Sequence, residues 1–483
     1  GASTGMVEPL VALAMAAAMA STTHVMEPTR DRLLETLRSL LRRGISLVQE
    51  YNESHLDFPM GAEHMANFAD RWLLHSLVWA FGGSMTWQGR EELGHFIVSH
   101  SNVTLPPDTN VIDMQVKVDD GEFEPWAVSV PRREIDSSQV TASDVVIPTT
   151  DTLRHVEVIQ SWLSSHKPLI LCGPPGSGKT MTLTSTLQAM PQLVLAPLNF
   201  SSGTTPELLL KTFAQYCEVA KTPKGWVMRP NPSLGVGKWL VVFCDEINLP
   251  EEDKFGTQRV ISFMRQMTEQ GGYWRPDCTW VSLSRIQFVG ACNPPTDPGR
   301  VPLSNRFMRH APLLLVDYPA PESLKQIYGT LNRAMLKMHP PLTAYLDSLT
   351  DAMIDFYGKN QNRFTADTAP QYIYSPRELS RWVRAMYEAM EPLEAMTPTE
   401  MVRLWAHEGM RLFSDRLITA EEKAWCDAAL DETAEGHFHG VDVGEAMARP
   451  ILFSKWIAKQ YSSVDREALR KFMTARLPSF YEE

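Results

Sequence analysis

The chain has 483 residues, enough for about three domains of ordinary size. Hydrophobic residues make up 44% and charged residues 21% of it, which excludes a mostly disordered or fibrous protein. A formal net charge of −12 argues against general binding of nucleic acid or of anionic membranes. The longest apolar run, residues 10–20, is shorter than the ~20 residues that a membrane-spanning helix needs. The six cysteines contain no CxxC pair, which favours a reducing compartment over a zinc or disulfide framework.

The N-terminal part of the chain, residues 7–100, is predicted to be helical. Leucines recur at three- and four-residue spacing over residues 33–41, behind the start signal Pro28-Thr29. A second apolar pattern covers residues 68–81, and Gly82-Gly83 supplies its stop. This part of the chain is therefore expected to pack as a helical subdomain.

The pattern then changes from a helical to an alternating period. Apolar and polar residues alternate over residues 112–119, and Asp120-Gly121 offers a hairpin turn before Phe123. Residues 131–150 are rich in Pro, Ser, Thr and Asp, which predicts a linker.

The pattern of residues 151–320 is typical of an α/β fold. A helix with apolar positions between Leu153 and Leu163 comes first. Short apolar runs follow at residues 169–172, 193–195, 240–243, 288–290 and 313–316. Continuous apolar runs that alternate with helices predict a parallel sheet buried on both faces. Beyond Pro319 the chain is predicted to be helical again.

The strongest chemical signal is an octet that directly follows the first of these strands. It consists of Gly173, Pro174, Pro175, Gly176, Ser177, Gly178, Lys179 and Thr180, and Met181 continues into a helix. The spacing fits G-x-x-x-x-G-K-[ST], in which glycines let backbone N–H groups cradle phosphate oxygens. Lys179 supplies a charge to the terminal phosphates, and the Thr180 hydroxyl binds Mg²⁺. The octet predicts binding of ATP or ADP with Mg²⁺; an ordinary glycine turn is the alternative.

An acidic pair, Asp245 and Glu246, ends the apolar run that begins at Leu240. The motif predicts that Asp245 binds the metal and that Glu246 polarises an attacking water. A solvated strand end is the alternative. Glu246 is the residue that distinguishes a potential hydrolase from a protein that only holds nucleotide.

An amide and three arginines complete the set of candidate site residues. Asn293 ends another strand and is predicted to hold the attacking water or the γ-phosphate, although Asn before Pro also forms turns. Arg306 and Arg309 are either surface charges or arginine fingers for a neighbouring subunit, with Arg306 preferred. Arg377 lies at a predicted helix start, where cations are disfavoured, which favours a phosphate-facing role.

The order of these parts resembles the AAA+ ATPases, and more closely the heavy chains of cytoplasmic dynein at the third of six ring modules. The stretches that carry the resemblance are CGPPGSGKTMT at 172–182, LNFSS at 198–202, FCDEINLP at 243–250, GTQRVIS at 256–262, VGACNPPTDPG at 289–299, YIYSPRE at 372–378 and RPIL at 449–452. Together they cover nearly the whole chain.

The resemblance implies an α/β fold, a P-loop AAA+ ATPase core with a parallel sheet and helical lid subdomains on both sides. Residues 1–142 correspond to the helical lid of the preceding, second module and a strand-rich connection. Residues 143–320 correspond to the large ATPase subdomain and 321–483 to the helical small (lid) subdomain. Residues 144–149, with Val146, Ile147 and Pro148, match the loop that packs against adenine in this family.

The resemblance also implies a function, a location and partners. Such a module binds ATP, hydrolyses it slowly and gates communication between the main ATPase site and the microtubule-binding region. Its implied partners are the adjacent AAA+ modules of the same heavy chain and the lissencephaly-type dynein regulator. Microtubules would be contacted only through parts of a heavy chain that this sequence lacks. The implied location is cytoplasmic and cytoskeletal, and neither nucleic acid nor membrane is expected as a partner.

In the ring that the resemblance implies, each nucleotide site lies between two modules. Arg306 and Arg309 would face the nucleotide of the second module, and the finger for the site of Lys179 would come from a fourth module.

Two alternatives remain at this stage. A nucleotide-binding scaffold without relevant turnover is disfavoured by Glu246 and Asn293. An AAA+ module of another giant six-module ATPase, such as the ribosome-maturation ATPase, is disfavoured by the FCDEINLP and YSPRE stretches.

Overall fold

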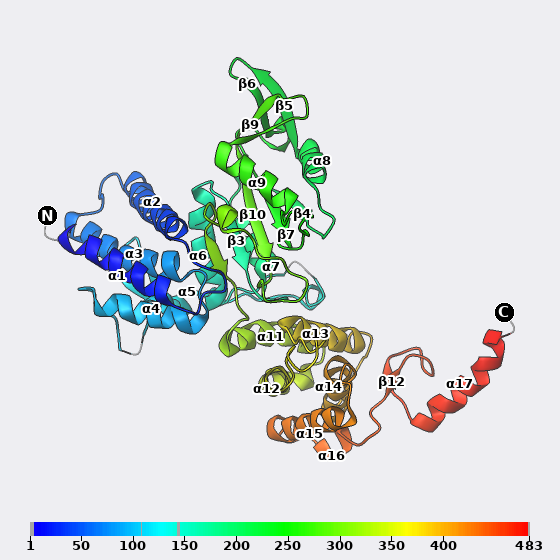
Figure 1. The fold of residues 1–483 in the computed structure, drawn as a ribbon. Coiled ribbons are helices and arrows are strands. Elements are labelled where there is room, and N and C mark those ends of the chain that lie inside the picture. The colour runs from blue at the N-terminus through cyan, green and yellow to red at the C-terminus, as the bar shows by residue number, and fades with distance from the viewer. Residues whose placement is uncertain (1–3, 108, 143–144, 482–483) are drawn as a thin grey trace. The chain divides into compact units, whose positions relative to one another are not determined.

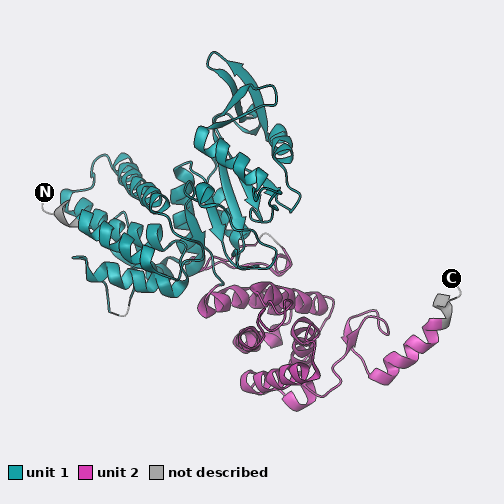
Figure 2. Cartoon of the chain, in the orientation of Figure 1, with its two compact units in different colours: residues 1–130, 150–318 teal, residues 131–149, 319–483 magenta. Residues whose placement is uncertain are grey.

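The computed structural model describes residues 4–107, 109–142 and 145–481, which form two compact units (Figures 1 and 2). Unit 1 comprises residues 1–130 and 150–318, and unit 2 comprises residues 131–149 and 319–483. No helix in the described part of the chain is both long and apolar enough to cross a bilayer.

Unit 1 begins with helices, as predicted. They are α1 (Thr4–Ala20), α2 (Arg30–Ser54), α3 (Ala62–Gly82) and α4 (Trp87–Ser99). Helix α2 starts directly after Thr29, and α3 stops at Gly82, so both boundary signals are confirmed. The turn η1 (Val111–Asp113), the antiparallel hairpin β1 (Met114–Val116) and β2 (Phe123–Pro125), and the short α5 (Trp126–Ser129) follow. The hairpin was predicted, but its strands are shorter than the alternating pattern.

A five-stranded parallel sheet forms the centre of unit 1, in the order β11-β3-β10-β7-β4. The strands are β3 (Leu169–Cys172), β4 (Leu193–Asn199), β7 (Trp239–Asp245), β10 (Ile286–Cys292) and β11 (Leu313–Leu315). The helices between and beside them are α6 (Thr150–Ser164), α7 (Lys179–Gln188), α8 (Pro206–Tyr216), α9 (Arg259–Gln270) and α10 (Asn305–Met308). The predicted α/β class and parallel sheet are therefore confirmed.

Both faces of this sheet are buried, because successive side chains of each strand enter different cores. Leu169 and Leu171 pack with α1 to α4, α6 and α7. Ile170 and Cys172 pack with α8, α9 and α10 on the other face. Burial on both faces explains why the strands are continuous apolar runs in the sequence.

A second sheet, of four strands, was not predicted from the sequence. Its order is β5-β6-β9-β8, with β5 (Cys217–Thr222), β6 (Gly225–Pro230), β8 (Gly272–Trp274) and β9 (Trp280–Leu283). In Figure 1 it extends beyond α9, away from the N-terminal helices. Its strands carry charged residues such as Glu218 and Arg229 between buried or half-buried ones, so no apolar run marks them.

Arg90 of α4 joins the N-terminal helices to the edge of the parallel sheet. Its guanidinium donates hydrogen bonds to the carbonyl oxygens of Gly82 (3.0 Å), Gly83 (2.9 Å) and Leu315 (2.7 Å). The Leu315 N–H in turn donates to the Gly83 carbonyl (2.7 Å), which continues the backbone pairing beyond the edge strand β11. Burial lowers the pKa of Arg90 to about 10. The helices and the sheet thus share backbone hydrogen bonds as well as an apolar core.

Unit 2 is mainly helical, as predicted for the chain beyond Pro319. Its elements are η2 (Ser137–Gln139), α11 (Pro321–Leu336), η4 (Pro340–Tyr345), α12 (Leu346–Arg363), α13 (Pro376–Met390), α14 (Pro398–Phe413), α15 (Ala420–His437), α16 (Val443–Ala446), β12 (Phe453–Ser454), β13 (Ser462–Ser463) and α17 (Arg466–Tyr481). The predicted linker over residues 131–150 is irregular in its described part up to α6, apart from η2, but it is not solvated throughout, because Ile135 and Val140 are buried in the core of this unit.

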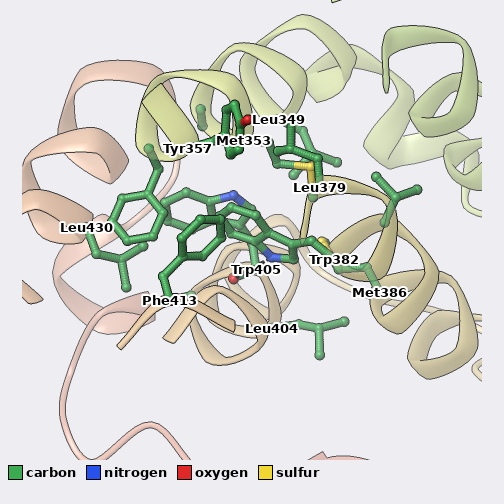
Figure 3. Packing of buried hydrophobic residues seen from close by; sticks show 14 of the residues in the cluster. Leu349, Met353, Tyr357, Leu379, Trp382, Met386, Leu404, Trp405, Phe413 and Leu430 are labelled. Carbon is green, nitrogen blue, oxygen red and sulfur yellow. Dashed lines mark hydrogen bonds between the residues drawn. The ribbon is translucent and has the colours of Figure 1, made fainter. Parts of the chain in front are cut away.

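The core of unit 2 is built around stacked aromatic rings. Figure 3 shows Trp382 of α13 beside Trp405 and Phe413 of α14. The Trp382 indole N–H donates to the Trp405 carbonyl (3.0 Å), which satisfies its polar atom in an apolar setting. Gly409 of α14 lies against the same indole, where an added Cβ would be 2.6 Å from Trp382 Cζ2.

We predict that Gly409→Ala destabilises unit 2 by about 1–3 kcal/mol, because the buried indole has to move. The matched control is Gly358→Ala in α12, where a Cβ meets nothing within 4 Å. That change should stabilise the unit by roughly 0.5–1 kcal/mol, since alanine is the better helix former. The measurement is urea unfolding followed by tryptophan fluorescence. Equal effects of the two substitutions would contradict the packing described for Trp382.

Candidate nucleotide site

The loop between β3 and α7 requires glycine at several positions. Gly176 and Gly178 have φ angles of 81° and 89°, in the left-handed region. Gly173 lies so close to β11 that an added Cβ would be 2.0 Å from the Val316 carbonyl oxygen. The Tyr318 hydroxyl donates to the carbonyl of Pro175 (3.1 Å). The loop is thus held from the sheet side, and Met181 continues it into the first turn of α7.

Lys179, the first residue of α7, is buried in this loop. Its ammonium donates hydrogen bonds to the carbonyls of Gly173 (2.7 Å) and Pro174 (3.0 Å) and to Asn293 Oδ1 (3.2 Å). Burial lowers the pKa of Lys179, while the Asp245 and Glu246 carboxylates oppose that shift. The Lys179 ammonium therefore lies, bonded to these three oxygens, where the motif predicts the terminal phosphates.

Thr180 and Asp245 face each other across the same loop. The Thr180 hydroxyl donates to Asp245 Oδ2 at 3.4 Å, and Asp245 is the last residue of β7. A hydroxyl and a carboxylate are hard oxygen ligands of the kind Mg²⁺ uses alongside waters and substrate phosphates. The predicted metal pair is therefore close together, and its chemistry fits Mg²⁺.

Glu246 follows Asp245 in an uncommon backbone conformation, with a φ angle of 58°. Its backbone N–H donates to Asp245 Oδ1 (3.0 Å), and its side chain forms an ion pair with Arg300. The side chain of Glu246 is 35% exposed and that of Arg300 is 14% exposed. Sequence reasoning missed Arg300, because a single arginine in a Pro/Gly-rich loop carries no pattern of its own.

Asn293 directly follows β10 and is buried. The backbone register pairs Cys292, the last residue of β10, with Cys172, the last residue of β3. Asn293 and Gly173 therefore follow the ends of two neighbouring strands. Asn248 donates to the Asn293 carbonyl (2.9 Å), an interaction that sequence reasoning also missed. The structure thus brings Lys179, Asp245, Glu246 and Asn293 to one edge of the sheet.

Arg306 and Arg309 lie elsewhere in unit 1, at the short helix α10. Both are exposed, and Arg309 Nη2 donates to Glu269 Oε1 of α9 (2.5 Å). Asn305, beside Arg306, donates to Glu27 Oε2 (2.9 Å) in the segment that precedes α2. The helix that carries Arg306 therefore contacts the N-terminal region through Asn305, and Arg309 already has an acidic partner.

The remaining predicted site residues belong to unit 2. Arg377 is exposed in the first turn of α13, behind a capping box in which the Ser375 N–H donates to Glu378 Oε2 (2.9 Å). Val146 and Pro148 accept hydrogen bonds from Arg133 (2.7 Å) and Gln326 (2.8 Å), and Ile147 between them is buried. Asp144 of the same predicted loop lies outside the described residues. The roles of these residues toward a nucleotide stay predictions.

Three family models match successive parts of the chain. Residues 134–319 match the family described as "P-loop containing dynein motor region". Residues 4–128 match "Dynein heavy chain AAA lid domain", and residues 331–423 match "Dynein heavy chain, ATPase lid domain". The chain belongs to the dynein heavy-chain family.

Individual dynein heavy chains agree with this assignment. The proteins named "Dynein heavy chain, cytoplasmic" from Dictyostelium discoideum, Drosophila melanogaster and Caenorhabditis elegans are 55%, 51% and 50% identical to it over 95% of this chain. The chain spans about 10% of the length of each of these relatives. The predicted location agrees with their names, and the alternative of a giant AAA+ ATPase outside the dyneins is not supported.

We predict that Lys179→Ala abolishes the rise in melting temperature that ADP with Mg²⁺ gives the wild-type chain. A ligand at a thousand times its dissociation constant stabilises a fold by about 4 kcal/mol, so the shift should be easily measured. The control is Lys211→Ala, on the exposed face of α8, which should keep the full shift. The measurement is the melting temperature of each variant by differential scanning calorimetry, with and without nucleotide. An unchanged shift in the Lys179 variant would rule out the P-loop as the binding site.

Proposed function

We propose that this dynein heavy-chain segment is a nucleotide-binding, slowly ATP-hydrolysing regulatory AAA+ module of a microtubule motor. In the motor it gates communication between the main ATPase site and the microtubule-binding region. The observation that carries the proposal is the convergence of Lys179, Asp245, Glu246 and Asn293 at one sheet edge. This set supplies a phosphate-binding cation, a metal ligand, a base and a water-orienting amide.

The proposed reaction transfers the γ-phosphoryl group of ATP to water. A bond forms between the water oxygen and the γ-phosphorus, the bond to the bridging oxygen breaks, and ADP leaves. Lys179 stabilises charge on the terminal phosphates, and Thr180 with Asp245 would hold Mg²⁺, which supplies further charge stabilisation there. Glu246 accepts the proton of the attacking water, which Asn293 orients.

The module assignment follows the resemblance to the third of six ring modules. Residues 1–142 then act as the lid of the second module with its strand-rich connection, 143–320 as the large ATPase subdomain and 321–483 as its own lid. Val146, Ile147 and Pro148 would contact adenine, and Arg377 would close on the phosphates. Arg306, which is exposed, would serve the second module's nucleotide, ahead of Arg309, which pairs with Glu269. Partners are the adjacent modules and a lissencephaly-type regulator.

A nucleotide-binding scaffold without relevant turnover is the second candidate. The ion pair between Glu246 and Arg300 favours it, because the guanidinium occupies an oxygen of the candidate base. The presence of Glu246 favours hydrolysis, because a scaffold that only holds nucleotide needs no base to polarise an attacking water. The two candidates differ in whether loss of the Glu246 charge changes the behaviour of the motor.

We predict very slow ATP hydrolysis by the isolated chain, because the arginine finger for its site would come from the following module. A finger contributes on the order of 10³ to 10⁵ in rate. Extending the chain through the following module should therefore accelerate turnover strongly. Phosphate release at saturating ATP is the measurement. Brisk hydrolysis by the monomeric 483-residue chain would contradict a site completed between modules.

We further predict that Glu246→Gln in a full motor blunts the release from microtubules that ATP causes. The substitution keeps the shape of the side chain but removes the charge that polarises water, so the site fills with ATP and stays filled. Lys179→Ala should instead leave the site empty. A ligand shifts an equilibrium only through its different affinity for the two states, so both variants should change the motor, though not necessarily alike.

The readouts are microtubule affinity with and without ATP and single-molecule velocity, for both variants and wild type. Wild-type behaviour of both variants would favour the scaffold.

A further inference from the structure

Arg300 lies in a loop whose position is fixed by the site itself. The loop leaves the sheet after Asn293, and turns at residues 297–300, where Gly299 has a φ angle of 74°. The Val301 N–H donates to the Asn248 carbonyl (3.0 Å), and the Asn248 side chain donates to the Asn293 carbonyl (2.9 Å). Asn248 itself is fully buried. These bonds hold the loop of Arg300 against the segment that carries Glu246.

The ion pair between Arg300 and Glu246 is largely shielded from water on the arginine side. The side chain of Arg300 is 14% exposed, and its Nη1 donates to Glu246 Oε2. A charge-assisted hydrogen bond in such a setting is stronger than one on an open surface. One oxygen of the candidate base is therefore engaged by a cation.

The backbone of Glu246 is also in a conformation that residues with a side chain seldom adopt. Its φ angle is 58°. Two hydrogen bonds hold the backbone here: the Ile247 N–H donates to the Ala291 carbonyl of β10, and the Glu246 N–H donates to Oδ1 of the preceding Asp245, both at 3.0 Å. Backbone strain at a reactive side chain is typical of positions where orientation matters. The orientation of Glu246 is thus set by its own backbone and by Arg300 together.

We propose that Arg300 is a positioning residue that restrains Glu246, so that hydrolysis requires this ion pair to open. The proposal deepens the proposed function, on which it rests, by naming a cause of slow turnover within the module. The carboxylate oxygen that the guanidinium engages is not free to accept a hydrogen bond from the attacking water until the pair opens. The restraint does not involve the phosphate-binding loop, so it should leave nucleotide binding alone.

The test compares single-turnover hydrolysis of ATP by the 483-residue chain with that of its variants. Arg300→Gln removes the cation, and should raise the rate constant about tenfold, since a hydrogen bond to a charged group is worth about that factor or more. The dissociation constant for ATP should stay within about twofold of wild type. Arg300→Lys restores the charge and should return the rate constant toward wild type.

Two further variants separate action through Glu246 from a general change of structure. In the Glu246→Gln background, Arg300→Gln should bring no acceleration, because the base on which it acts is gone. Arg229→Gln breaks a more exposed arginine–glutamate pair, with Glu218 on the remote β5-β6 hairpin, and should keep the wild-type rate.

Each result bears on one claim. A rate that is unchanged or lower in Arg300→Gln, while Glu246→Gln abolishes turnover, overturns the restraint and leaves the proposed function standing. Acceleration that persists without Glu246 also overturns the restraint. Turnover that is insensitive to Glu246→Gln overturns the proposed function itself. A chain in which neither wild type nor Arg300→Gln hydrolyses ATP overturns the restraint alone, because the proposed function already expects very slow turnover without the following module.

Discussion

The hydrogen-bonded register of β10 between β3 and β7 is the constraint on which the candidate site depends. It pairs Cys292 with Cys172 on one side and Gly290 with Cys244 on the other, so the carboxyl ends of the three strands lie at one edge. Lys179 and Asn293 are 114 residues apart in sequence, yet their side chains are hydrogen-bonded at 3.2 Å. A shift in this register would separate the phosphate-binding cation from the amide and the acidic pair without altering any of these residues.

The same sheet also carries the N-terminal helices, through Arg90 and the backbone of Gly83 at its β11 edge. That edge adjoins the phosphate loop, because Gly173 abuts the Val316 carbonyl and Tyr318 contacts Pro175. A packed interior transmits small displacements. If the N-terminal helices are the lid of the preceding module, as we propose, the loop that binds the nucleotide of this module is rigidly connected to the lid over the nucleotide of the preceding one. Such a connection is a physical basis for a module that gates its neighbours.

The sequence was most informative where one physical cause dominates. The strand at residues 169–172 was located to the residue, because burial on both faces leaves only apolar side chains there. The phosphate loop was equally clear, because its positive φ angles favour glycine and so leave a mark in the local sequence. The β5-β6-β9-β8 sheet was missed because its half-buried strands mix charge with apolar residues. Ile135 and Val140 were assigned to a linker because isolated apolar residues in a polar stretch show no period. Arg300 was missed for a related reason: its importance comes from a contact with Glu246 that only the folded loop creates.

A nucleotide site at the carboxyl edge of the parallel sheet should be evident in the nucleotide content of the purified chain. The chain would be incubated with ADP and Mg²⁺, freed of unbound nucleotide by gel filtration, denatured, and its supernatant analysed by ion-exchange chromatography. About one adenine nucleotide is expected for each folded chain, because one P-loop cradles one set of phosphates. A folded chain that retains no nucleotide, and shows no binding by calorimetry, would contradict the existence of this site.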